Sequence, residues 1–173
     1  MSRFAIVCAL SLVSLPAMAQ PKGFSWGLMF GSTNYSQTGF SFDMPTITGR
    51  AIYNLNSWLG VEGRLAYGES DTDNGIDMGM DGLGGGYLKI SVETIERLYV
   101  TAYGGYATFD TTAEVGGVST TVNKSGASAG VSFDFYASPS NGLNIEWMRY
   151  FDDTLRGVDT TIDHIGIGYF QKF

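Results

Sequence analysis

The chain has little of what most soluble proteins and helical membrane proteins contain. Only 16% of its 173 residues are charged, against about 25% in an average soluble domain. It has four prolines and one cysteine, and past the N-terminus no apolar run approaches the roughly 20 residues that a membrane-spanning helix needs. Glycine (24 residues) and aromatic side chains (14%) are instead frequent. These features exclude a bundle of membrane helices and argue against an ordinary soluble domain.

The first 19 residues have the pattern of a cleaved export signal. Arg3 supplies a positive start, Phe4–Leu15 is a short apolar segment, and an Ala-Met-Ala motif ends at Ala19. Signal peptidase reads such small-x-small motifs, which places the cut before Gln20. An N-terminal anchor helix is the alternative, but the segment is short and the cleavage motif is clean. We therefore expect residues 1–19 to be a signal peptide.

Removal of this segment leaves one acidic domain, residues 20–173, without cysteine. Cys8 lies within the leader, so the mature chain can form no disulfide, thiol nucleophile or thiolate metal site. Loss of Arg3 leaves 9 basic and 17 acidic residues, a net charge of −8. Because nucleic-acid-binding domains carry basic patches, we expect no nucleic-acid partner.

The mature chain alternates between apolar and polar residues with period two, which is typical of strands with two different faces. Eight such runs lie near residues 24–31, 47–55, 59–68, 82–92, 98–106, 126–135, 143–151 and 164–173. In the clearest run, one face carries Ala127, Ala129, Val131, Phe133 and Phe135, and the other carries Gly126, Ser128, Gly130, Ser132 and Asp134.

The connections between the runs alternate in length. Short turns near Asn56-Ser57, Glu93–Glu96 and Ser138–Gly142 separate long polar connections, a pattern of membrane barrels with short periplasmic turns and longer outer loops. The sequence therefore predicts an all-β fold, an eight-stranded antiparallel up-and-down transmembrane β-barrel with both termini on the periplasmic side. The long connections are expected at Ser36–Pro45, Glu69–Asp81, Asp110–Asn123 and Asp152–Thr161.

The composition of the polar face decides which face points inward. In a soluble sandwich or lipocalin-like barrel, the alternative, it would be rich in Lys, Glu, Arg and Thr. Here it is mostly Gly, Ser, Asn and Tyr, which suit the crowded interior of an eight-stranded barrel. Six charged residues also point inward by parity, three of each sign. Since buried charges are costly unless paired, we expect an ion-pair network that plugs the lumen, made of Arg50, Glu62, Arg64, Lys89, Asp134 and Glu146.

Arg149 does not fit this alternation. Parity places it on the lipid face together with Trp147 and Phe151. Its long side chain could reach lipid head groups from the outer end of its strand, or a bulge could shift the register of the strand. The sequence leaves both interpretations open.

Several glycine-rich and aromatic segments resemble the small outer-membrane β-barrel family, which includes OmpA-type transmembrane domains and opacity-like "porin family" proteins. They are Gly82–Leu88, Tyr103–Tyr106, Ser125–Val131, Glu146–Tyr150 and Gly166–Phe173. The resemblance implies insertion by the barrel-assembly machinery, which recognises the last strand. Gln171 departs from the family pattern, which prefers an apolar residue there. The assembly signal would then comprise Ile165, Ile167, Tyr169 and Phe173.

Catalytic and metal motifs are weak. His164 is the only histidine, and the His-x-Ser pair of lipid A deacylase barrels is missing because Gly166 stands at the serine position. No N-terminal amphipathic helix of the palmitoyl-transferase type is seen. The segment Asp71–Asp77 places its glycine fifth, whereas a calcium loop needs it sixth. We expect no enzymatic activity, no cofactor and no metal site.

The favoured function is therefore that of an integral outer-membrane protein with a structural or surface-interaction role and at most weak permeability to small solutes. The alternative is a surface adhesin or resistance protein that acts through acidic outer loops. A lipid-modifying enzyme and a soluble lipocalin-like carrier are less favoured. The expected partners are outer-membrane lipids, lipopolysaccharide and the assembly machinery, and the expected state is a monomer in the outer membrane after export.

Overall fold

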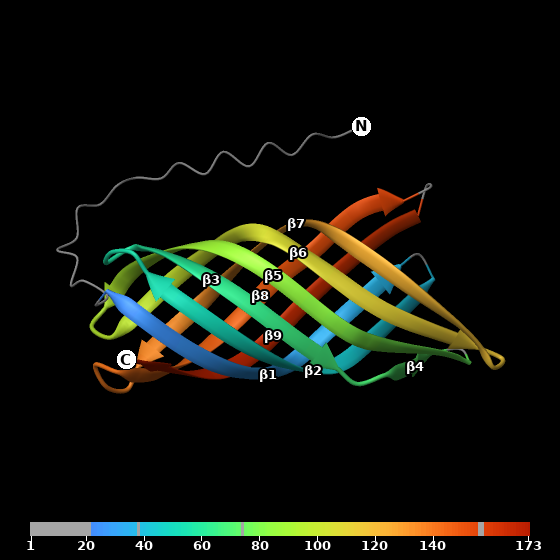
Figure 1. Ribbon diagram of the computed structural model, residues 1–173, viewed down its shortest axis with the longest axis horizontal. Coiled ribbons are helices and arrows are strands. Elements are labelled where there is room, and N and C mark those ends of the chain that lie inside the picture. Colours follow the sequence, from blue (N-terminus) through green and yellow to red (C-terminus); the bar gives the residue numbers. More distant parts are fainter. Residues whose placement is uncertain (1–21, 38, 74, 156–157) are drawn as a thin grey trace.

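The computed structural model describes residues 22–37, 39–73, 75–155 and 158–173 (Figure 1). The predicted signal peptide lies outside these residues. The described part contains no helix long and apolar enough to cross a membrane. Its nine strands are β1 (Gly23–Gln37), β2 (Phe40–Asn54), β3 (Leu59–Gly68), β4 (Asp71–Asp73), β5 (Ile76–Ile95), β6 (Leu98–Val115), β7 (Val118–Tyr136), β8 (Asn141–Leu155) and β9 (Val158–Lys172).

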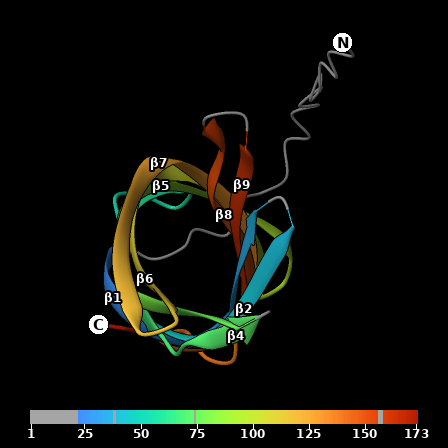
Figure 2. The ribbon, with the colours of Figure 1, turned by 90° about the vertical axis from the view of Figure 1, so that its right-hand side faces the viewer.

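Eight of these strands close into a ring, which Figure 2 shows end-on. Except for β3 and β4, consecutive strands pair antiparallel. β3 pairs with β5, and β1 pairs with β9 from Ser25 opposite Lys172 to Gln37 opposite Thr160. The short β4 pairs only with the start of β5. The predicted eight-stranded antiparallel up-and-down barrel is thus confirmed. Both edges that an open sheet would expose are paired.

The end of the barrel opposite the termini is here called the outer end. The prediction of long connections at this end is wrong. Most of the described residues in these segments belong to strands, with β1 and β2 paired up to Gln37 opposite Phe40. Likewise β6 and β7 remain paired up to Val115 opposite Val118. The turn between them is only Gly116-Gly117, and both glycines have positive φ, which two-residue hairpin turns require and glycine adopts without strain. The polar composition of these segments suggests loops. They are strands in which the alternation continues, but with polar side chains outward and apolar side chains inward.

The polarity of the two faces inverts along the barrel. Near the termini the outward side chains are apolar, as with Leu65 at 75% and Leu88 at 59% exposure, and the inward ones are polar. Toward the outer end, Phe42 and Met44 point inward and are buried, while Asp43 between them is exposed. Lipid accepts apolar side chains outside the wall, whereas water requires them inside. The strands therefore extend beyond the membrane as a water-exposed structure with its own apolar core.

The outward apolar side chains near the termini form a continuous belt, here called the apolar band. It includes Phe24, Trp26, Leu28, Phe30, Ile47, Tyr53, Val61, Leu65, Tyr67, Leu88, Ile90, Val92, Tyr106, Phe133, Phe135, Leu143, Ile145, Trp147, Ile165, Ile167 and Tyr169.

A β-bulge explains the irregular parity around Arg149. The β8–β9 register shifts between Arg149 and Phe151, so Tyr150 and Phe151 both point inward, at 2% and 7% exposure. The prediction that Phe151 faces lipid is therefore wrong, because the bulge adds one residue to β8. Arg149 itself stays outward, just before the shift.

β7 and β8 separate toward the outer end, as Figures 1 and 2 both show. Their pairing ends at Ala129 opposite Arg149. The Phe151 ring lies against Gly126 of β7, where an added Cβ would come within 2.9 Å of the ring. The Lys124 ammonium lies 5.4 Å from the ring centroid of Phe151. Side chains from both strands thus fill the divergence.

Candidate functional site in the barrel lumen

Four of the six charged residues predicted for the lumen meet in one cluster, here called the quartet: Arg50 of β2, Glu62 and Arg64 of β3, and Glu146 of β8. All four side chains are at most 2% exposed. Glu62 and Arg64 are two residues apart, so the strand period places both inside. Glu146 reaches them from the opposite wall of the barrel.

The quartet is a closed ring of four ion pairs, three of which are charge-assisted hydrogen bonds. Arg64 Nε donates to Glu62 Oε1 at 2.6 Å, and Arg64 also forms a two-pronged contact with Glu146, with Nη2 to Oε2 at 2.7 Å. Arg50 Nη1 donates to Glu146 Oε2 at 3.3 Å and lies 3.8 Å from Glu62 Oε1. Arg50 and Arg64 are direct cross-strand partners, so the two carboxylates relieve a repulsion that the ladder would otherwise impose.

Tyr87 of β5 and Tyr103 of β6 flank the quartet. The Arg64 Cζ atom lies 4.8 Å from the ring centroid of Tyr87 and 4.7 Å from that of Tyr103. Such cation–π contacts add to the binding of a desolvated guanidinium. The sequence signal that could have identified Tyr87 and Tyr103 is their inward parity, which they share with the three inward cations.

Lys89 and Asp134 point inward but do not join the quartet. Asp134 instead accepts hydrogen bonds from Thr101 Oγ1 at 2.7 Å and Ser132 Oγ at 2.8 Å. Among the described residues, no carboxylate lies within 4.0 Å of the Lys89 ammonium. The six residues therefore form a quartet and two separate charged groups rather than one network.

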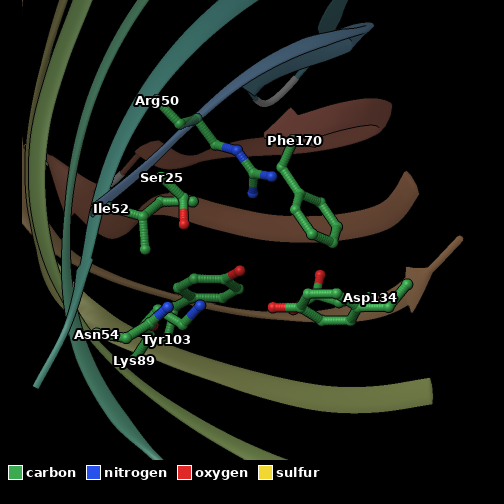
Figure 3. A pocket seen from close by; sticks show the side chains of 9 residues that line it. Ser25, Arg50, Ile52, Asn54, Lys89, Tyr103, Asp134 and Phe170 are labelled. Carbon is green, nitrogen blue, oxygen red and sulfur yellow. The ribbon is translucent and has the colours of Figure 1, made fainter. Parts of the chain in front are cut away.

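Between the quartet and the termini lies a small cavity of about 10 Å³, room for about one water molecule. Figure 3 shows Arg50, Lys89 and Asp134 approaching this space from different strands. Arg50 Nε and Asn54 Oδ1 are buried there without a hydrogen-bond partner in the part of the chain that the structure describes. Side chains of several strands thus converge on this space.

On the outer side of the quartet the lumen is lined mainly by apolar side chains. Its core is rich in methionine and aromatic side chains, which pack irregular spaces well. Its buried members are Tyr35, Phe42, Met44, Ala66, Met78, Met80, Leu83, Tyr87, Tyr103, Ala107, Phe109, Met148, Tyr150, Phe151 and Ile162.

His164 is buried beside this core at 1% exposure. Its Nδ1 atom lies 3.0 Å from the Thr33 hydroxyl, which also accepts a hydrogen bond from Thr46 at 2.9 Å. The opposite ring nitrogen has no hydrogen-bond partner among the described residues, so none of their carboxylates orients the ring as a catalytic base requires. In the described ranges, no three His, Cys, Asp or Glu residues are placed to hold a metal ion.

Arg149 lies outward between acidic side chains. Its Nε and Nη2 atoms donate to the two carboxylate oxygens of Asp163 at 2.8 and 3.0 Å, and Nη1 donates to Asp152 at 3.0 Å. Its Cζ atom lies 5.6 Å from the centroid of the Trp147 ring system. Two carboxylates thus neutralise the guanidinium next to the bulge, so its charge is not directed at lipid head groups.

The predicted assembly signal lies on the outward face of β9. Ile165, Ile167, Tyr169 and Phe173 are all exposed there. Phe173 N donates to Phe24 O at 3.0 Å, and the two rings stack with centroids 5.9 Å apart. The outward Gln171 accepts a hydrogen bond from the Tyr169 hydroxyl at 2.6 Å. The last strand is thus joined to the first by backbone and side chains.

A closed antiparallel ring with an apolar band outside and a polar interior at the same level is the architecture of an outer-membrane β-barrel protein. Residues 5–170 match the model of the outer membrane protein beta-barrel domain family, and the chain belongs to this family.

Several solved structures share the fold. Neisserial surface protein A, NspA, is 12% identical with a TM-score of 0.74, covering 87% of this chain and 97% of that one. Ail, the attachment invasion locus protein of Yersinia pestis, is 15% identical with a TM-score of 0.61 in its complex with the heparin analogue sucrose octasulfate, covering 87% and 99%. The N-terminal barrel of Pseudomonas aeruginosa OprF is 11% identical with a TM-score of 0.58, covering 87% and 99%. No curated protein sequence matches the chain.

Proposed function

We propose that this chain is a non-conducting outer-membrane barrel with a structural or surface-interaction role, and that its lumen is closed in two layers. The quartet, whose four side chains bridge the lumen from three strands, carries this proposal. The apolar core on its outer side forms the second layer. A hydrated ion would have to break paired charges and then cross a segment lined mainly by apolar side chains, and both steps are costly.

Planar-bilayer recording of the purified protein tests the closed lumen. The wild type is expected to show no steady conductance. Replacement of all four quartet residues by alanine, combined with Met44→Ala and Met80→Ala, widens both layers and is expected to give channel events, which shows that the assay detects open barrels. A steady, large conductance of the wild type would contradict the proposal.

A surface-binding role is the second candidate, and the acidic exterior of the outer end favours it. The exposed outward residues there include Asp43, Asp77, Asp81 and Glu114. Arg149 is neutralised by Asp152 and Asp163. Such a surface attracts cationic ligands and repels polysulfates of the kind bound in the Ail complex.

Column binding distinguishes the two charge classes of ligand. The detergent-folded protein is expected to bind immobilised poly-lysine at low salt, to elute at high salt, and to pass through immobilised heparin. An Asp43→Asn/Asp77→Asn/Asp81→Asn variant should elute from poly-lysine at lower salt. Retention on heparin would exclude this form of the surface-binding role.

We further propose that residues 1–19 direct export and are removed before Gln20, and that the assembly machinery inserts the barrel as a single chain. N-terminal sequencing of protein from isolated outer membranes tests the cut, and any start other than Gln20 contradicts it. We propose no catalytic role, since His164 is buried beside the apolar core.

A further inference from the structure

The lipid-facing wall is hollowed on one side of the barrel. A depression of about 690 Å³ lies over β1, β2, β3 and β5. A second one, of about 340 Å³, lies next to it toward the outer end, between Phe30, Ile47, Tyr67 and Glu69. The rows Leu28–Gly49–Leu65 and Phe30–Ile47–Tyr67 are adjacent, so the two depressions are aligned along β2; together they are here called the groove.

The register of the paired strands explains why the outer surface of the barrel is depressed there. Leu28, Gly49, Leu65 and Gly84 lie side by side across four strands. One step toward the termini, Trp26, Ala51 and Gly63 form the next row. Gly49, Ala51 and Gly63 face outward but offer no large side chain. These three residues form the floor of the depression. Its walls are the larger side chains beside them, those of Trp26, Leu28 and Leu65.

We propose that this groove seats one acyl chain of a membrane phospholipid whose head group lies at Glu69. The groove is continuous with the apolar band, which already contacts lipid tails, so an acyl chain reaches it without crossing water. Its polarity matches that of a lipid, with an apolar floor and an exposed carboxylate at the outer mouth. Glu69 attracts the ammonium of an ethanolamine head group and repels the phosphates of a lipid A-type glycolipid.

The seat concerns the outer wall alone, so it goes beyond the proposed function and does not depend on a closed lumen. Lipid tails are as apolar as leucine, so burial in a bilayer gives an acyl chain little hydrophobic gain, and close packing must hold it. Glycine at positions 49 and 63 permits that packing, because without a side chain there the acyl chain contacts the backbone of the sheet directly.

Native mass spectrometry of the detergent-folded protein tests the seat, with equal amounts of saturated phosphatidylethanolamine and a lipid A-type glycolipid added. The wild type is expected to retain one phosphatidylethanolamine. Gly49→Leu and Gly63→Leu should each lower the retained fraction about tenfold, since the new side chain removes on the order of ten van der Waals contacts between the acyl chain and the sheet. Glu69→Gln should reduce the preference for phosphatidylethanolamine over the glycolipid.

The matched control is Gly104→Leu on β6, outside the groove. An added Cβ meets no atom within 4 Å at Gly63 or Gly104, and only a carbonyl oxygen at 3.9 Å at Gly49, so all three variants should fold, as a heat-dependent gel shift verifies. Leu65→Ala, which removes a wall of the groove without filling it, should also weaken retention. Equal retention in the control and both groove variants would overturn the proposal. Preferential retention of the glycolipid would overturn it too. So would complexes of two protein chains that are lost in the same variants, because the groove would then bind a second copy of the protein.

Discussion

Arg64 lies between two carboxylates and two aromatic rings, and none of these contacts reaches solvent. A guanidinium suits this position because its planar fork binds two carboxylates at once and its faces remain free for stacking. The same contacts make the site intolerant of change. Removal of one partner from a buried charged group leaves the others unpaired.

Arg64→Met is therefore expected to destabilise the barrel by about 3–5 kcal/mol, because Glu62 and Glu146 lose their strongest partner. Arg149→Met removes a cation of the same kind from a partly exposed ion pair and should cost about 1 kcal/mol or less. Urea unfolding followed by tryptophan fluorescence in the same detergent measures both. Equal losses at the two sites would show that the quartet is not the stronger cluster.

At the scale of the strands, period-two alternation is sufficient to predict the parts of all eight ring strands that lie near the termini. It also predicts that Arg50, Glu62, Arg64 and Glu146 point inward. Parity cannot tell which inward charges touch across the lumen, because contact depends on strand tilt and on side-chain reach. The sequence therefore groups Lys89 and Asp134 with the quartet, which they do not join. It also failed in the outer segments. There the same period carries the opposite polarity, and a bulge moves Phe151 to the other face.

The polarity inversion makes a prediction within a single strand. Met80 and Leu88 lie on β5, but Met80 is buried at the outer end and Leu88 faces lipid. Met80→Ala should cost about 2–5 kcal/mol, the range for a large core truncation, whereas Leu88→Ala should cost far less because lipid or detergent fills the space. Urea midpoints of the two variants give the comparison. A larger loss for Leu88→Ala would contradict an apolar core beyond the membrane.

For the whole molecule, closure of the ring depends on the seam between β1 and β9, where Phe173 contacts Phe24 through backbone and ring. The family resemblance gives Phe173 a second role, in recognition by the assembly machinery. These two roles predict different outcomes for the two sides of the seam.

Deletion of Phe173 should sharply reduce the heat-modifiable, folded fraction in isolated outer membranes. Phe24→Ala removes the same ring stacking from the other strand and should reduce that fraction only slightly. Refolding of both variants into detergent, where no machinery acts, should be nearly equal. Normal insertion of the deleted protein in cells would rule out terminal recognition.

The inversion of strand polarity also fixes the depth of the barrel in its bilayer. A vertical shift by two residues, about 6–7 Å along a strand, would either bring Asp43 and Asp81 toward hydrocarbon or lift Phe30 and Tyr67 into water. A barrel with a polar rim of loops could follow a change in membrane thickness, but this one cannot without such exposure. Hydrophobic mismatch must therefore be absorbed by the surrounding lipids, which thin or thicken to match the protein.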